Sequence, residues 1–148
     1  MGWIIFFAGT MAIFLFTGSF KKWSRLWYAG VIAMAELYAI DSTLITLGAF
    51  SYQYPCPFIG KLPVFYWLSS FFGGATLAYY YPARKLFRLP YIVLSAFLFL
   101  LLELVMHFFG YFNYHNWTPL RSFFLDIIGF AAFIWTWERV NEIRSRET

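Results

Sequence analysis

The chain has 148 residues, of which 61% are hydrophobic, 26% are aromatic and only 12% are charged. Soluble domains carry about 25% charged residues, so this composition excludes a water-soluble globular protein and favours one integral membrane domain over residues 1–148. The net charge of +4 does not indicate nucleic-acid binding, because the basic residues stand in short clusters between apolar runs and act as topology determinants.

Five apolar runs follow one another along the chain, and about 20 such residues suffice for a helix that crosses a bilayer. Segments rich in Pro and Gly or in basic residues separate the runs. The sequence therefore predicts an all-α bundle of five transmembrane helices, followed by a charged tail over residues 138–148. The expected spans are residues 2–20, 26–50, 64–81, 91–112 and 120–137.

Five spans place successive loops on alternate sides of the membrane, and the basic residues are divided unequally between the two sides. One side holds only Lys61 and Arg121. Because cytoplasmic loops are enriched in Lys and Arg, we predict the N-terminus outside and the C-terminus in the cytoplasm. The residues on the cytoplasmic side are Lys21, Lys22, Arg25, Arg84, Lys85, Arg88, Arg139, Arg144 and Arg146.

Small residues recur at intervals of four in the third run, at Ser70, Gly74 and Ala78. Ala29 and Ala33 have the same spacing in the second run. Lipid gives helices little hydrophobic reason to associate, so small residues mark the positions where two backbones approach closely. We therefore expect the third run to pack tightly through this ridge.

The sequence has a single cysteine, Cys56, so an intrachain disulfide is excluded. We predict that Cys56 is a structural thiol in a constrained loop.

The fourth run carries an acid near its middle. Glu103 lies within residues 91–112, and His107 follows four positions later, so both side chains share one helix face. Gly110 extends this face and lets a neighbouring helix come close. A carboxylate at the centre of a spanning helix costs on the order of 2.5–3.5 kcal/mol on insertion scales. These side chains therefore require partners or a function.

Further acids stand within other apolar runs. Glu36 and Asp41 belong to the second run and Asp126 to the fifth, with Arg121 about one turn above Asp126. The predicted topology places most of these groups at the midplane or in the outer half of the bilayer, with Glu36 slightly to the cytoplasmic side. We expect one polar site contributed by three helices. Its candidate residues are Glu36, Asp41, Glu103, His107, Arg121 and Asp126.

Three interpretations of this cluster remain open. Carboxylates with a histidine relay protons or bind a cation during transport, and intramembrane ionisable residues are functional hypotheses by default. The same groups perform acid–base chemistry on a lipid or isoprenoid in a membrane enzyme. They also serve as interhelical pairs in a structural or assembly subunit. Glu103, His107 and Asp126 are possible metal ligands, but the helix lacks a second histidine, so we predict neither metal nor cofactor.

The segments LPVFYWLSSFFGG and LDIIGF, together with the acid-bearing fourth run, resemble small multi-pass membrane proteins of spore-forming Gram-positive bacteria. No activity is established for that family, so the resemblance transfers no catalytic residue. It implies a bacterial cytoplasmic membrane. Five helices are few for a complete transporter, so the expected partners are the lipid bilayer and either further copies of the chain or a larger membrane protein, with no nucleic acid.

Overall fold

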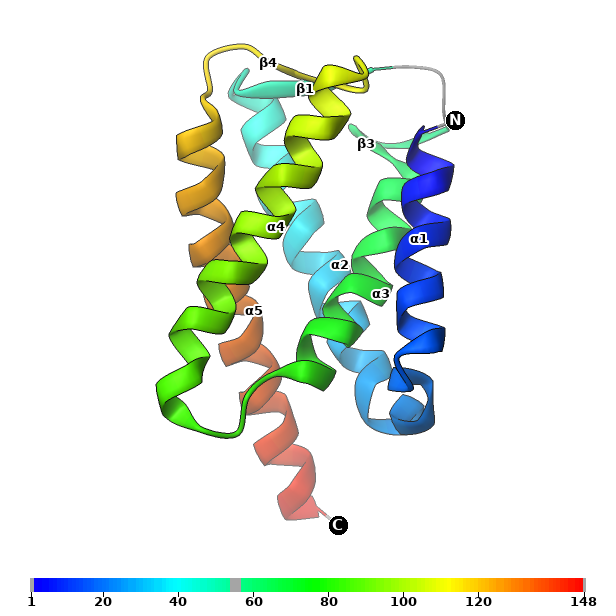
Figure 1. Ribbon diagram of the computed structural model, residues 1–148, viewed down its shortest axis with the longest axis vertical. Coiled ribbons are helices and arrows are strands. Elements are labelled where there is room, and N and C mark those ends of the chain that lie inside the picture. Colours follow the sequence, from blue (N-terminus) through cyan, green and yellow to red (C-terminus); the bar gives the residue numbers. More distant parts are fainter. Residues whose placement is uncertain (1, 54–56, 148) are drawn as a thin grey trace.

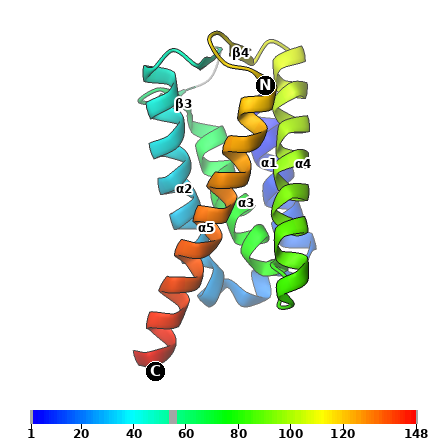
Figure 2. The ribbon, with the colours of Figure 1, turned by 90° about the vertical axis from the view of Figure 1, so that its left-hand side faces the viewer.

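The described part of the chain has five α-helices, which run along the long axis of the molecule (Figure 1). The computed structural model describes residues 2–53 and 57–147. The prediction of an all-α fold is confirmed. The N- and C-termini lie at opposite ends, and α5 continues beyond the other helices (Figure 2). The helices are α1 (Gly2–Phe16), α2 (Trp23–Thr46), α3 (Val64–Tyr80), α4 (Arg88–Phe108) and α5 (Pro119–Glu147).

Within the described residues, three helical segments are long and apolar enough to cross a membrane, namely Ser19–Thr46, Lys85–Phe108 and Pro119–Arg144. They indicate a membrane protein. The helices α1 and α3 have 15 and 17 residues. At 1.5 Å per residue they are about 23 and about 26 Å long, somewhat shorter than a hydrocarbon core of about 30 Å.

Several helix ends differ from the predicted spans, and glycine explains three of them. The spans ending at residues 20, 50 and 112 were predicted too long, since Gly18, Gly48 and Gly110 adopt φ values of 79°, 72° and 76°. A left-handed glycine ends a helix by turning the chain so that the last carbonyls find donors. After Gly48 the Ala49 amide donates to the Leu44 carbonyl at 3.0 Å. The hydrophobicity of the surrounding residues does not predict these helix ends.

Short 3-10 helices join the long ones at the C-terminal end of the bundle. The first, η1 (Ser19–Lys22), leads directly into α2, and the second, η2 (Lys85–Phe87), leads into α4. The fourth long helix therefore begins at Arg88, three residues before the predicted span. We call this end of the molecule the basic end, because η1, the turn over residues 81–87 and the last turns of α5 carry most of the lysines and arginines.

Two short strand pairs close the opposite end, where the sequence predicted only loops. Strand β1 (Phe50–Tyr52) pairs antiparallel with β4 (Phe112–Tyr114), with Tyr52 opposite Phe112. Strand β2 (Phe58–Ile59) pairs with β3 (Leu62–Pro63) around a turn at Gly60. We call the β1–β4 pair the strand cap. Cys56 lies outside the described residues, so its predicted role stays a prediction.

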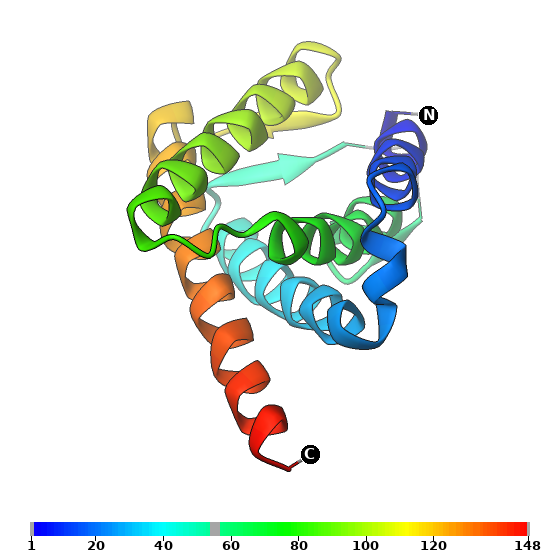
Figure 3. The same ribbon diagram turned by 60° about the horizontal axis from the view of Figure 1, so that its bottom comes forward.

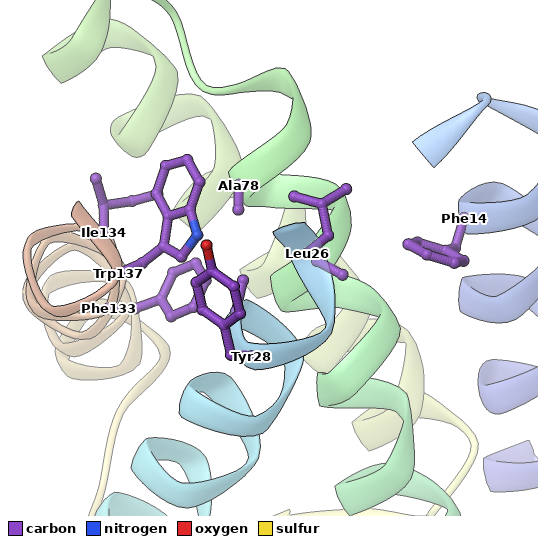
Figure 4. Packing of buried hydrophobic residues seen from close by; sticks show 9 residues of the cluster. Phe14, Leu26, Tyr28, Ala78, Phe133, Ile134 and Trp137 are labelled. Atoms are coloured by element: carbon purple, nitrogen blue, oxygen red, sulfur yellow. The ribbon is translucent and has the colours of Figure 1, made fainter. Parts of the chain in front are cut away.

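The helices pack in two groups that share α2. The helix α3 lies between α1 and α2, whereas α4 packs on α5, which in turn contacts α2. In Figure 3, α4 stands apart from α1 on the far side of the bundle. One buried cluster lies toward the basic end, where Phe133 and Trp137 of α5 meet Tyr28 and Ala78 (Figure 4). A second cluster lies beneath the strand cap.

A close helix contact joins α2 and α3 at Gly74. A Cβ atom at Gly74 would overlap the Cβ of Ala33 and would lie 3.3 Å from the carbonyl oxygen of Ala29. Gly74 is itself buried. Two backbones meet here because neither helix presents a side chain larger than a methyl group, which is the contact that small residues make possible in membranes.

We expect Gly74→Ala to destabilise the fold by about 1–3 kcal/mol, since the added methyl group overpacks the α2–α3 contact. The matched control is Gly73→Ala, on the same helix, where an added Cβ meets no atom within 4 Å. That change should be neutral or raise stability by up to about 1 kcal/mol through helix propensity. Melting temperatures of both variants in detergent test the difference, and equal melting temperatures would contradict it.

Candidate functional site

A cavity of about 200 Å³ lies inside the bundle, between the two buried clusters, and all five helices contribute to its walls. The helix α1 contributes Phe6 and Thr10, and α4 contributes Phe99 and Leu102. The helix α3 contributes its small-residue face around Gly73, so part of the wall is bare backbone. A cavity of this volume holds several water molecules or a small organic molecule.

Three carboxylic acids face this cavity. Glu36 and Asp41 come from α2 and Asp126 from α5. None of the described residues that line the cavity is a lysine, an arginine or a histidine. Hydroxyl groups complete its polar surface. The lining residues that carry them are Thr10, Tyr66, Ser69 and Ser70.

Asp41 is connected to the strand cap. Its side chain is 7% exposed, and its Oδ2 accepts a hydrogen bond of 2.6 Å from the hydroxyl of Tyr52 in β1. Burial raises the pKa of the Tyr52 hydroxyl well above its ordinary value, and the nearby Asp41 carboxyl is the second largest cause of this shift. Tyr52 therefore stays a neutral donor. This bond fixes the cap to the C-terminal part of α2, 11 residues away in the chain.

Glu103 faces a smaller space of about 30 Å³ above the main cavity, which it shares with Tyr52 and Tyr66. Its Oε1 accepts a hydrogen bond of 3.1 Å from Ser122, and Ser122 accepts one of 3.1 Å from the indole of Trp117. Its Oε2 is buried without a hydrogen-bond partner among the described residues. Tyr66 and Phe99 line both spaces, so the two cavities adjoin.

The other two acids of the cavity differ in how they are bonded. Glu36 accepts a hydrogen bond of 3.1 Å from Thr136 of α5, which ties α2 to α5. For Asp126, the buried Oδ2 has no hydrogen-bond partner within the described part of the chain. A buried polar atom that the protein leaves unpartnered requires water, a proton or a ligand. Asp126 is therefore the acid best placed to receive a ligand.

His107 and Arg121 lie outside both spaces. The Nδ1 of His107 is 2.8 Å from the carbonyl oxygen of Phe112, and its ring packs on Tyr114 at 5.1 Å. His107 follows Glu103 by four residues, but it lies at the end of α4, which stops at Phe108. The turn after α4 brings the strand cap to the imidazole, so His107 contacts the cap. Arg121 is exposed, with its guanidinium 5.8 Å from the Trp117 ring centre. The structure thus brings Glu36, Asp41 and Asp126 together, with Glu103 adjoining.

Two tyrosines and two serines at the site were not among the candidate residues. Tyr66 and Ser69 lie three residues apart on the cavity side of α3, a polar stripe that the sequence displays within residues 64–81. Ser122 precedes Asp126 by one helical turn and shares its face. Tyr52 gives no such signal, because its place depends on the pairing of β1 with β4, some 60 residues further along the chain.

The described residues contain no group of three or more His, Cys, Asp or Glu side chains close enough to hold a metal ion. Comparisons with protein-family models, with curated protein sequences and with solved structures returned no match to the chain. The resemblance to the membrane proteins of spore-forming bacteria therefore stays a prediction.

We expect Tyr52→Phe to destabilise the protein by about 1–3 kcal/mol, because it removes the hydrogen bond that the Tyr52 hydroxyl donates to the buried Asp41 carboxyl. Tyr111→Phe is the matched control, since Tyr111 packs on Trp3 at the same end and its hydroxyl makes no hydrogen bond among the described residues. Melting temperatures in detergent distinguish the two. A drop of the same size in both variants would show that the Tyr52–Asp41 bond contributes nothing of its own.

Proposed function

We propose that the chain spans the bacterial cytoplasmic membrane five times and binds a small cation, in exchange for protons, in the carboxylate-lined cavity. The five-span topology is supported by the termini at opposite ends of the bundle and by the concentration of basic residues at one end. By the positive-inside rule the basic end faces the cytoplasm and the strand cap faces outward. The short helices α1 and α3 cross with their flanking residues in the interface.

The observation that carries the function is that Glu36, Asp41 and Asp126 line one cavity whose described lining has no basic residue. An ionised carboxylate in a low-dielectric interior is costly unless a positive charge accompanies it. An empty cavity therefore favours protonated acids, and a bound cation favours ionised ones. Binding and proton release are coupled by this difference, which is the basis of proton-linked cation exchange.

The lining favours an organic cation over a bare metal ion. No three metal-ligating side chains converge among the described residues, and about 200 Å³ greatly exceeds the volume of one ion. Phe99 and Phe130 stand against the cavity with ring centres 5.8 Å apart. Aromatic faces attract organic ammonium groups, and a carboxylate supplies the opposite charge. A protonated amine or quaternary ammonium compound therefore fits the cavity best.

A structural role is the second candidate, and the interhelical hydrogen bonds favour it. Thr136 bonds Glu36 and Ser122 bonds Glu103, so each of these acids also joins two helices. In this alternative the acids set the register of α5 against α2 and α4, and the cavity holds only water. Asp126 separates the two candidates, because its unpartnered Oδ2 does not bond another helix.

The proposed function predicts that tetraethylammonium binds the purified protein with release of protons. Calorimetric titrations in two buffers of different ionisation enthalpy count those protons. We expect Asp126→Asn to weaken binding at least tenfold, since it removes the unpaired carboxylate. Glu142→Gln removes an exposed acid of the C-terminal tail and should bind like the parent protein. Unchanged binding by Asp126→Asn, or none by the parent, would favour the structural role.

The proposed orientation predicts which thiols an impermeant reagent reaches in intact cells. Cys56 should be labelled without permeabilisation. In a Cys56→Ser background, Ala83→Cys places a thiol in the exposed turn over residues 81–87, and it should be labelled only after the membrane is opened. The reverse pattern would invert the orientation, and labelling of both positions from outside would exclude an odd number of spans between the two.

A further inference from the structure

A second and larger depression, of about 670 Å³, lies at the basic end of the bundle, away from the carboxylate-lined cavity. Its walls come from the start of α2, the turn between α3 and α4, and the last turns of α5. Three arginines line it, namely Arg25, Arg88 and Arg144. We call this depression the arginine groove.

Aromatic rings hold two of these arginines in place. The guanidinium carbon of Arg144 lies 4.7 Å from the centre of the Tyr28 ring, and that of Arg88 lies 5.0 Å from the centre of the Tyr81 ring. Such cation–π contacts orient the flat guanidinium groups. The Tyr28 hydroxyl donates to Asn141 at 2.7 Å, so the ring that supports Arg144 is itself fixed.

The charge of the groove is positive. Its lining holds three arginines and two glutamates. Arg88 pairs with Glu138 at 3.2 Å. The buried Nε of Arg88 has no hydrogen-bond partner within the described residues. Lys21, Lys22, Arg84 and Lys85 of the adjoining turns add further positive charge at this end.

The groove also lies at the level where the apolar helix surfaces end. Trp137 lines its inner wall, and Figure 4 shows Trp137 beside Tyr28 and Phe133 in the apolar cluster beneath it. Trp135 is 61% exposed on the outside of α5 at nearly the same height. Tryptophan and tyrosine collect at the headgroup level of a bilayer. The arginines therefore stand where the phosphates of the lipids lie.

We propose that the arginine groove binds the phosphate of an anionic phospholipid, with Arg25 and Arg144 as its principal ligands. Guanidinium groups bind phosphate oxygens with paired hydrogen bonds, and basic pockets at helix ends on the cytoplasmic side suit lipid headgroups. The open groove admits the glycerol while the acyl chains stay along the apolar helices. A bound headgroup joins α2 to the last turns of α5. The inference is independent of the cation site.

The test compares two double variants that each remove two positive charges. Arg25→Gln/Arg144→Gln alters the groove, and Lys61→Gln/Arg121→Gln alters the strand-cap end. Each protein is titrated in neutral detergent with phosphatidylglycerol, phosphatidylcholine or inorganic phosphate, with melting temperature and native mass spectrometry as readouts. We expect phosphatidylglycerol to raise the melting temperature of the parent and to remain bound. The phosphatidylglycerol concentration at half-saturation should rise at least tenfold in the groove variant and stay unchanged in the other double variant.

Three results would overturn the proposal. An equal shift in both double variants would reduce the effect to overall charge. Equal stabilisation by phosphatidylcholine would show that the anionic headgroup is not recognised. Competition by inorganic phosphate at similar concentrations would assign the groove to a soluble phosphorylated compound. If the groove double variant does not fold, Arg25→Gln alone carries the same comparison against Lys61→Gln, because Arg25 is exposed near the start of α2.

Discussion

The cost of placing carboxylic acids inside an apolar bundle is the constraint on which the rest of this structure depends. Each acid in the interior needs a hydrogen-bond donor, a proton, water or a positive ligand. The chain supplies donors from distant elements, with Tyr52 of the strand cap bonding Asp41 and Thr136 of α5 bonding Glu36. Asp126 at the cavity wall keeps an oxygen with no hydrogen-bond partner among the residues that the structure describes. A fold that paired every acid would be the simpler structural solution, so the unpartnered carboxylate oxygens of Asp126 and Glu103 call for a functional explanation.

The cavity exists because the bundle is unevenly packed. Gly74 allows α2 and α3 to approach closely, and α1 packs on α3 in the same group. The helix α4 packs instead on α5 and lies apart from α1 (Figures 1 and 3). The space between these groups is lined by small residues of α3 and by rings of α4 and α5. The helices are thus closely packed at the α2–α3 contact and leave a cavity between the two groups. The helix α2, which carries two of the acids, belongs to both groups.

The sequence predicted the helices well and their ends less well. Long apolar runs fix where a helix lies, whereas Gly18 and Gly48 decide where it stops, and their left-handed conformation overrides the hydrophobicity around them. At the site, the predicted topology set the acids of α2 and α5 at similar depths, and Glu36, Asp41 and Asp126 line one cavity. The prediction failed for His107, whose partner is a carbonyl beyond the helix end. Tyr52 was beyond prediction, since only the long-range pairing of β1 with β4 brings it to Asp41.

The most direct test of a cation site is to locate the cation. An experimental structure of the protein with a bromine-labelled quaternary ammonium compound, solved with anomalous data, shows where the ligand binds. The account predicts a bromine signal within the carboxylate-lined cavity, with the ammonium group beside Asp126 and within reach of Asp41. A cavity filled only with ordered water, with the bromine signal outside the bundle or missing, would contradict the account and leave the acids with a structural role.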